Sequence, residues 1–456
     1  MRKNSLVQGS IFKALLLFSL PMMITNTVSI MFHAADVAVL ALLVDGPAVA
    51  AVGACGSIIT LLVSVFTGLS SGANVLISKR VGAGDGEGTR RAVGTSLVIG
   101  LCSGIILMII GCLFSRQILT LMHCQADVLD MATLYMTIYF VGMPIRMLNS
   151  FATAILRSSG DSVRPMYYMI ISGVTNVGAN FFFVAVCNMT VEGVALATML
   201  SSALTLSLTL IRLFRDKGIC RVELKQLRIR KTEFFEIVRV GVPTCFCSIF
   251  FYIASVVLTS CVNSMSTEAM TASSISGQFD GVIYTVGAAI ATATSVMVAQ
   301  NYGARQIDRI PKIMRTGVIY GTSVSLTLGI TFVLFSDFLL GLLSDSPKVI
   351  DIAKDRMTLL CLSYFVTTIM EVMSFSLRAL KRQKSTMVVG AICGMGMRCL
   401  WAWFVWPLYP TLWMLYSIFA ISALVAIIIY VFVYVDAMKK IRLEEQGSQP
   451  VVGVCG

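Results

Sequence analysis

Residues 92–115 read AVGTSLVIGLCSGIILMIIGCLFS, a run of 24 residues without Asp, Glu, Lys or Arg. An α-helix rises about 1.5 Å per residue, so a run of this length crosses the roughly 30 Å hydrocarbon core of a bilayer. The rest of the 456-residue chain has the same character, since 57% of its residues are hydrophobic and 13% are charged. A mean hydropathy of +0.86 excludes a water-soluble globular protein.

The spacing of charges along the chain predicts twelve membrane spans. Four of them are interrupted by one charge each: 14–40 by Asp36, 131–156 by Arg146, 357–377 by Glu371, and 386–407 by Arg398. The other spans come from stretches without any charge, the last of which also holds the end of the 386–407 span. These stretches are 46–78, 92–115, 165–191, 193–211, 240–267, 281–304, 316–336 and 399–435. The apolar run from Ala14 is too long for a cleavable signal peptide and is expected to be the first span.

The distribution of basic residues predicts the orientation, because Lys and Arg accumulate in short cytoplasmic loops. With the amino terminus inside, the cytoplasmic segments hold 29 of the 35 Lys and Arg residues. Outer loops hold only Arg116, Lys348, Lys354 and Arg356. Both termini are therefore expected to be cytoplasmic, and the net charge of +12 needs no nucleic-acid partner. The 13 cysteines contain no Cys-x-x-Cys pair, which argues against a disulfide framework or a structural metal site.

A weak internal repeat divides the predicted spans into two sets of six. Gly82-Ala83 matches Gly303-Ala304 at an offset of 221 residues, and Arg157 matches Arg378 at the same offset. Six spans per half enter the membrane in the same direction, so the two lobes are expected to relate by a pseudo-twofold axis along the membrane normal. The expected domains are an amino-terminal lobe (1–211), a cytoplasmic linker (212–239), a carboxy-terminal lobe (240–437) and a cytoplasmic tail (438–456).

An ordered series of short motifs resembles the multidrug and toxic compound extrusion (MATE) transporters over nearly the whole chain. Asp36 and the segment Val44–Gly53 are similar to the family's first-helix Asp and its G-x-x-A-x-A-A-V-G segment. The remaining motifs are the loop Arg157–Pro165, the helix opening Val191–Thr198, Asp280, and Gln300–Ala304, which resembles G-Q-N-x-G-A.

The resemblance implies an antiporter of the bacterial cytoplasmic membrane that expels amphipathic, often cationic drugs or toxins in exchange for H⁺ or Na⁺. It implies no enzyme activity and no cofactor beyond the coupling ion, and a monomer is expected. The family's cation-coupling site corresponds here to Asp36, Asn176, Asn180 and Thr198. Several family members carry Asp at the position of Asn180, so one carboxylate is missing from this site.

Asp36 lies deep in its predicted span, where an ionised carboxylate costs about 2.5–3.5 kcal/mol. This cost is consistent with two chemistries. The carboxylate either takes up a proton, or joins the oxygens of Asn176 and Asn180, one helical turn apart, in binding Na⁺. The alternative is an Asp that only fixes helix packing through hydrogen bonds.

Three charged residues of the second half are candidate substrate-binding residues. Glu371 and Arg398 lie at depths that differ by about 7.5 Å at ~1.5 Å per residue, so the two side chains are able to pair. Such a pair either fixes two helices or exposes a carboxylate during transport. Asp280 is expected to begin the eighth span near the outer surface, as a substrate contact or a solvated helix cap. Arg146, in the first half, is expected to snorkel toward the cytoplasm.

Other functions are less compatible with the sequence. Gly68-Leu69-Ser70-Ser71-Gly72 matches the G-x-S-x-G motif of hydrolases, but it lies inside a predicted helix rather than in a strand-to-helix turn. A flippase for lipid-linked or polysaccharide precursors shares the architecture of this superfamily and is the main alternative. It favours a strongly cationic cavity, whereas the predicted spans carry charges of both signs. A receptor without transport predicts a sensory domain, for which only short loops are present.

Overall fold

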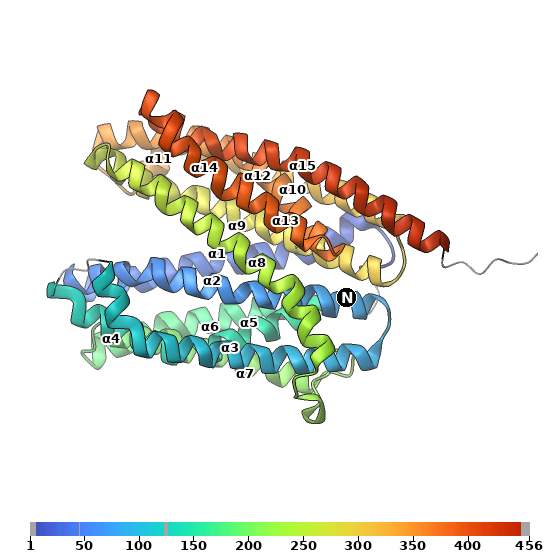
Figure 1. The fold of residues 1–456 in the computed structure, drawn as a ribbon. Coiled ribbons are helices and arrows are strands. Elements are labelled where there is room, and N and C mark those ends of the chain that lie inside the picture. The colour runs from blue at the N-terminus through green and yellow to red at the C-terminus, as the bar shows by residue number, and fades with distance from the viewer. Residues whose placement is uncertain (1–5, 45, 123–125, 448–456) are drawn as a thin grey trace, which may run out of the picture. The chain divides into compact units, whose positions relative to one another are not determined.

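The computed structural model describes residues 6–44, 46–122 and 126–447, and every regular element among them is helical (Figure 1). Eleven helices in this part of the chain are long and apolar enough to cross a membrane, and one bent pair completes a twelfth span. The predicted all-α membrane protein is confirmed. Its helices form two compact units.

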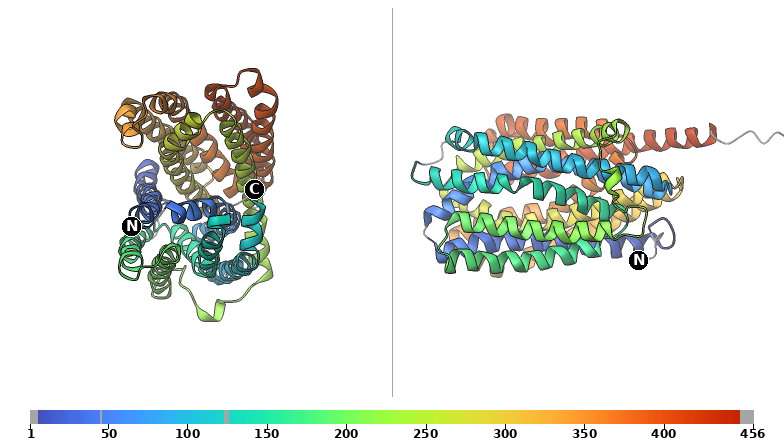
Figure 2. Two further views of the ribbon diagram at one scale, coloured as in Figure 1. Left: turned by 90° about the vertical axis from the view of Figure 1, so that its left-hand side faces the viewer. Right: turned by 90° about the horizontal axis from the view of Figure 1, so that it is seen from below.

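The first unit holds residues Leu16–Tyr252, and Figure 2 shows its helices end-on as a bundle. Its elements are α1 (Ile11–Leu43), α2 (Gly46–Gly82), α3 (Gly86–Leu121), α4 (Ala126–Val141), α5 (Met143–Ser158), α6 (Val163–Phe181), the π-helical turn η1 (Phe182–Val186), α7 (Val191–Phe214), the 3₁₀ turn η2 (Leu224–Gln226) and the first part of α8 (Lys231–Asn263).

The second unit holds Leu6–Leu15 and the chain from Ile253 onward. Its elements are the end of α8, α9 (Thr267–Gly303), α10 (Arg309–Leu334), α11 (Ser336–Gly341), α12 (Pro347–Ala379), α13 (Gln383–Val389), η3 (Gly390–Gly396), α14 (Met397–Leu400), η4 (Trp401–Val405), η5 (Trp406–Leu408) and α15 (Leu412–Gly447). Because α1 and α8 continue from one unit into the other, both boundaries between units fall inside helices rather than inside a loop.

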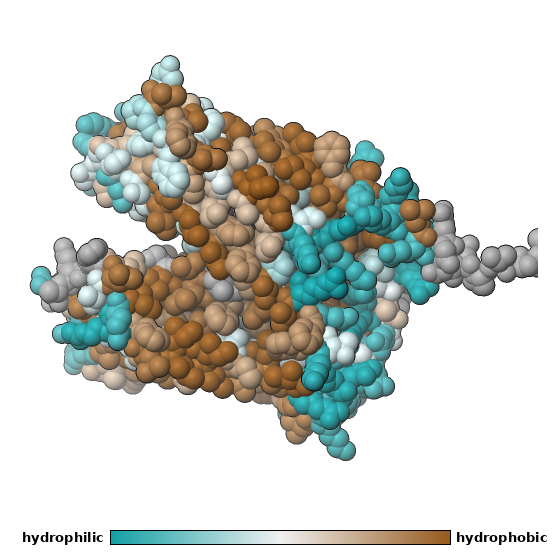
Figure 3. All heavy atoms as spheres, viewed as in Figure 1, coloured by the Kyte–Doolittle hydropathy of each residue, from teal (hydrophilic) through white to brown (hydrophobic). Residues whose placement is uncertain are grey.

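The helix α3 shows how these sequences form packed membrane helices. Small residues on its inner face let neighbouring side chains approach, so that Phe151 of α5 lies against Gly100 and Phe140 of α4 lies against Gly111. Its outward face carries apolar side chains such as Ile106 and Leu113, which are about half exposed. Figure 3 shows hydrophobic side chains of this kind along the middle of the helices and hydrophilic ones at their ends.

The predicted span at 131–156 is a broken one. The helices α4 and α5 meet at an angle of 46°. Pro144 lies in the first turn of α5, two residues after Gly142, where proline has no helical hydrogen bond to lose but prevents α4 from continuing. The break places Arg146 in the first turn of α5.

The segment between α7 and α8 packs on the first unit. The carbonyl of Arg228 accepts a hydrogen bond of 3.1 Å from Thr95 of α3, and Glu223 forms an exposed ion pair with Arg90. Cys220 joins the hydrophobic cluster beneath this segment. Burial, aided by Asp216, raises the pKa of the Cys220 thiol to about 12.

Candidate functional site

A cavity of about 540 Å³ lies within the first unit. Six helices line it, namely α1, α2, α4, α5, α6 and α7. Its wall carries two charged side chains, Asp36 and Arg146, together with the aromatic side chains of Tyr135 and Tyr139 and several hydroxyl groups. This combination of apolar surface and a few polar groups is typical of sites for small organic molecules, which commonly occupy about 300–1,000 Å³.

Asp36 contacts one of its expected partners directly. The amide Nδ2 of Asn180 donates a hydrogen bond of 2.5 Å to Asp36 Oδ1. Asn180 is fully buried, and its Oδ1 has no hydrogen-bond donor among the described residues. A buried acceptor without a donor costs about 1–3 kcal/mol. The pair therefore offers a carboxylate and a spare amide oxygen to a cation.

Asn176 and Thr198 line the same cavity as Asp36. Asn176 lies one helical turn before Asn180 on α6 and is 5% exposed. The hydroxyl of Thr198 donates to the Val194 carbonyl of its own helix at 2.9 Å, which leaves the hydroxyl oxygen available as an acceptor. The structure thus brings the four candidate coupling residues together from three helices, and their role in coupling stays a prediction.

Arg146 lies in the cavity wall. Its guanidinium lies over the ring of Tyr139, 4.7 Å from the ring centroid. Arg146 thus lines the cavity in the first turn after the bend, and its snorkelling toward the cytoplasm stays a prediction. Pro144, two residues earlier, is the signal in the sequence that could have indicated a break here.

Asp280 does not begin a helix near a surface. The helix α9 starts at Thr267, so Asp280 lies well inside it and is 6% exposed. Its Oδ2 is 3.2 Å from the guanidinium of Arg356 and accepts a hydrogen bond from the Tyr364 hydroxyl at 3.4 Å. The same guanidinium donates to Ser276 at 2.7 Å. The expected solvated cap is wrong, and Asp280 is part of a buried charge cluster in the second unit.

Arg356 itself was expected in an outer loop. The structure places it in the third turn of α12, 7% exposed and 4.5 Å from the ring centroid of Tyr416. When spans are assigned from the spacing of charges alone, this span begins at residue 357, because the preceding residues include Lys354 and Asp355. These two point away from the core while Arg356 points inward, which is the signature of an amphipathic helix turn.

Glu371 and Arg398 do not form the direct ion pair that their depths suggest. The guanidinium of Arg398 lies over the Phe419 ring, 4.3 Å from its centroid, and donates to Ser422 at 3.4 Å. Glu371 is only partly buried and is attracted electrostatically to Arg378 as well as to Arg398. The π-helical turns η3 and η4 flank Arg398. Because each such turn holds more residues than an α-helical turn, they rotate the side chain away from its expected direction.

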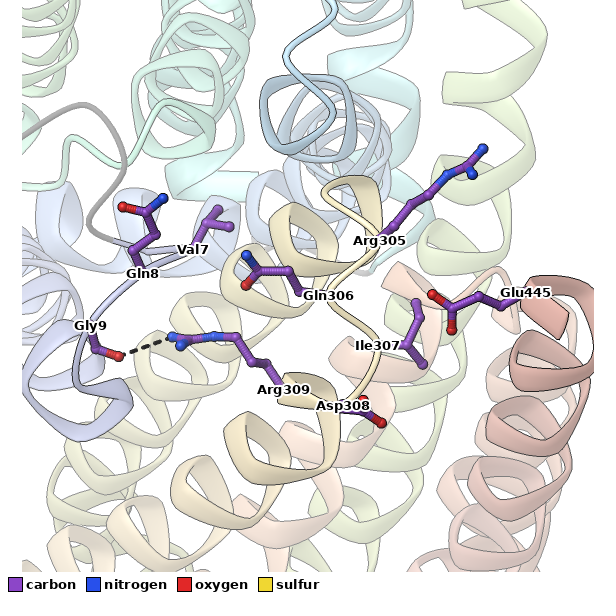
Figure 4. A pocket seen from close by; sticks show the side chains of 9 residues that line it. All are labelled: Val7, Gln8, Gly9, Arg305, Gln306, Ile307, Asp308, Arg309 and Glu445. Carbon is purple, nitrogen blue, oxygen red and sulfur yellow. Dashed lines mark hydrogen bonds between the residues drawn. The ribbon is translucent and has the colours of Figure 1, made fainter. Parts of the chain in front are cut away.

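A second cavity, of about 450 Å³, lies beside the amino-terminal segment of the second unit (Figure 4). Arg309 donates a hydrogen bond of 3.2 Å to the Gly9 carbonyl there. Asn301, from the Gln300–Ala304 motif, donates to the Leu6 carbonyl at 3.1 Å and accepts from Arg309 Nε at 3.2 Å. The motif thus anchors the segment before α1, a role that its sequence did not indicate.

Comparison with known proteins is consistent with this architecture. The sequence model of the MatE family matches the chain twice, over residues 21–182 and over residues 243–404. This chain belongs to the MatE family. The double match supports the internal repeat. The chain is a multi-pass membrane protein of a transporter family.

Several curated bacterial proteins resemble this MatE chain. The "Probable multidrug resistance protein YoeA" of Bacillus subtilis (strain 168) is 26% identical over 377 residues, which is 81% of each chain. The "Probable multidrug resistance protein NorM" of Thermotoga maritima is 24% identical over 385 residues, 83% of this chain and 82% of that protein.

Solved structures show the same fold. One is described as the outward-facing conformation of a multidrug resistance MATE family transporter of the MOP superfamily. It matches with a TM-score of 0.89 over 96% of this chain and 99% of its own, at 21% identity. Another, "Crystal structure of MATE in complex with Br-NRF", has a TM-score of 0.81 at 20% identity, over 97% and 99% of the two chains.

Proposed function

We propose that this chain is a secondary active exporter of amphipathic compounds that works by antiport with H⁺ or Na⁺. The coupling cation binds at Asp36 with Asn176, Asn180 and Thr198, and the exported compound occupies the adjoining cavity of the first unit. The observation that carries the proposal is the contact between Asp36 and Asn180 beside this cavity. Membership of the MatE family and the names of its multidrug-resistance relatives support export as the function.

The geometry supports coupling because the proposed cation site forms part of the wall of the proposed substrate cavity. Asp36 supplies the negative charge, and the Oδ1 of Asn180 supplies a buried acceptor that has no donor among the described residues. A bound proton or Na⁺ neutralises the carboxylate and so changes the charge of the cavity that a cationic compound meets. Cation binding and drug binding then oppose each other, which is the thermodynamic requirement for antiport.

The helix α1 connects this chemistry to the rest of the chain. Asp36 lies near the carboxyl end of α1, while residues before Leu16 belong to the second unit. Pro21 interrupts the hydrogen bonding of α1 between these two points. A change in charge at Asp36 is therefore expected to act on a helix that both units share.

The test is ethidium efflux from proteoliposomes under a proton gradient and, separately, under a sodium gradient. We expect one gradient to drive efflux in the wild type, and the Asp36→Asn variant to fall to the level of empty liposomes. Asp130→Asn is a matched control, because Asp130 is an exposed carboxylate that pairs with Arg116 at 2.8 Å, away from the cavity.

The possible outcomes of this assay distinguish the antiporter from its alternatives. Equal efflux by Asp36→Asn and wild type at equal protein abundance rejects Asp36 as the coupling residue. If neither gradient drives efflux although the protein elutes as a folded species, the antiporter is rejected and the flippase is favoured. Efflux driven by one gradient and lost only in Asp36→Asn supports the proposal and names the ion.

A further inference from the structure

The segment between α7 and α8, residues 215–230, joins two helices that are each long and apolar enough to cross a membrane. Both of its ends therefore lie at the same membrane surface. In the end-on view of Figure 2 (left), this light-green segment extends outward beyond the helices of the first unit. It thus lies beside that bundle, at the level where lipid headgroups surround the helix ends.

One face of the segment packs on the first unit and fixes its shape. Cys220 and Val222 are 2% and 3% exposed and belong to a hydrophobic cluster of that unit. The amide of Val222 donates to the Leu213 carbonyl at 3.2 Å, and the Arg228 carbonyl accepts from Thr95 at 3.1 Å. A chain held at these points presents its other side chains in a defined arrangement.

The opposite face is strongly basic. The two carboxylates of the segment are already used, since Asp216 pairs with Arg212 at 3.0 Å and Glu223 pairs with Arg90 at 3.4 Å. Six exposed basic side chains of 215–231 have no carboxylate within ion-pair distance among the described residues. They are Arg215, Lys217, Arg221, Lys225, Arg228 and Lys231. Basic residues this close to a span attract anionic lipids, and the attraction acts over about one Debye length, roughly 8–10 Å.

Two large apolar side chains lie exposed among these charges. Leu224, the first residue of η2, is 73% exposed, and Ile229 is 51% exposed. Basic and apolar side chains on one face are typical of segments that lie in a membrane interface, with the apolar groups below the headgroups. Long Lys and Arg side chains reach the headgroups from such a position. The place of the segment next to two spans makes the bilayer the partner that fits this face.

We propose that residues 215–231 bind the bilayer surface through anionic phospholipid headgroups. Lys225, Arg228 and the other unpaired basic residues contact the phosphates, and Leu224 and Ile229 enter the boundary between headgroups and acyl chains. This surface is separate from the cavity of the first unit and adds a lipid-binding site to the transporter. Because α8 begins at Lys231, bound lipid also holds the start of this helix.

Amide hydrogen exchange of the full-length protein in lipid nanodiscs tests the proposal. One set of nanodiscs contains phosphatidylcholine alone, and the other contains equal amounts of phosphatidylcholine and phosphatidylglycerol. The variants are Leu224→Ser and the double substitution Lys225→Gln/Arg228→Gln. The matched control is Lys312→Gln/Arg315→Gln, which removes the same charge from exposed residues of α10 that have no ion pair among the described residues.

Exchange in residues 215–230 of the wild type is expected to be about fivefold or more slower with phosphatidylglycerol than without it. Salt near 1 M should remove most of this difference, because the Debye length falls to about 3 Å. The Lys225→Gln/Arg228→Gln variant should lose most of it as well, while the control keeps it. Leu224→Ser should exchange faster than wild type in both lipids, because apolar insertion does not depend on headgroup charge.

Equal exchange of the wild-type segment in the two kinds of nanodisc overturns the proposal and leaves a solvated basic loop. A lipid effect that persists unchanged in Lys225→Gln/Arg228→Gln, or that is lost equally in the α10 control, rejects this face as the lipid-binding surface. Unchanged exchange in Leu224→Ser rejects insertion of its side chain.

Discussion

Asp280 and Arg356 form an ion pair in the interior of the second unit, with both side chains 8% exposed. Their mutual attraction offsets the large cost of removing two charges from water only while both partners are present. Tyr364 and Ser276 supply further hydrogen bonds to the two groups. At the scale of single residues, this cluster therefore stabilises the packing of α9 against α12.

The effects of removing the two partners of this pair should not add, because either removal alone leaves the other charge buried and unpaired. We expect Asp280→Asn or Arg356→Gln alone to destabilise the protein by about 3–5 kcal/mol, because each leaves an uncompensated buried charge. The double variant should cost clearly less than the sum of the two. Thermal unfolding of the purified protein in detergent, followed by size-exclusion chromatography, measures the order of stability.

The exposed pair of Lys354 with Asp337 provides the control for this prediction. Lys354→Gln should change stability by about 0–1 kcal/mol, since exposed ion pairs contribute little. If the effects of the two buried substitutions simply add in the double variant, Asp280 and Arg356 are not energetically coupled.

At the scale of helices, the bend between α4 and α5 depends on close packing against α3. A Cβ atom at Gly104 would lie 2.5 Å from the Cα of Pro144 and 2.9 Å from the carbonyl oxygen of Met143. Backbone atoms at a helix break cannot move as a flexible side chain can. Gly104 therefore allows the break that places Arg146 in the cavity wall.

Gly104→Ala is expected to destabilise the protein by about 1–3 kcal/mol through overpacking. Gly178→Ala, in α6, is the matched control, because nothing lies within 4 Å of a Cβ there. Alanine favours helix over glycine by about 0.8–1.0 kcal/mol, so the control should be neutral or slightly stabilising. Equal unfolding temperatures for the two variants would contradict this account of the bend.

At the scale of the whole molecule, the amino-terminal segment joins the second unit while most of α1 belongs to the first. The anchor consists of Asn301 and Arg309, which hold the carbonyls of Leu6 and Gly9. Phe12 adds an edge-on contact with Tyr320, 6.0 Å between ring centroids. The start of the shared helix is thus held by side chains that lie about 300 residues away in the sequence.

Asn301→Ala is expected to release this segment by removing a hydrogen bond to its backbone and one to Arg309. Amide hydrogen exchange in residues 6–15 should rise about fivefold or more, in line with about 1 kcal/mol per hydrogen bond lost. Arg305→Ala is the control, since Arg305 lines the same cavity without a hydrogen bond to the segment among the described residues. Unchanged exchange in Asn301→Ala would show that the segment is held in another way.

Hydropathy and the spacing of charges were enough to predict the class of protein, the number of spans and the internal repeat. Apolar runs of 20 residues or more have one stable solution in a membrane, because every backbone polar group must be satisfied within the helix. The motifs around Asp36 and Asn180 indicated the family, and the structure brings these two residues into contact. Hydropathy depends only on the composition of each segment of the chain, so it can be evaluated without knowing which residues lie next to that segment in the fold.

The positions of the charged side chains inside the helical units, by contrast, depend on the fold. Arg146 was expected to snorkel toward the cytoplasm from within its span, Asp280 to lie near the outer surface, and Arg356 to lie in an outer loop. Glu371 was expected to be able to pair with Arg398. Each of these outcomes depends on where a helix begins, bends or changes its turn, as at Pro144, Pro347 and the π-helical turns around Arg398. The direction of a side chain follows from helix phase and from partners far away in the sequence, and neither is contained in the local spacing of charges.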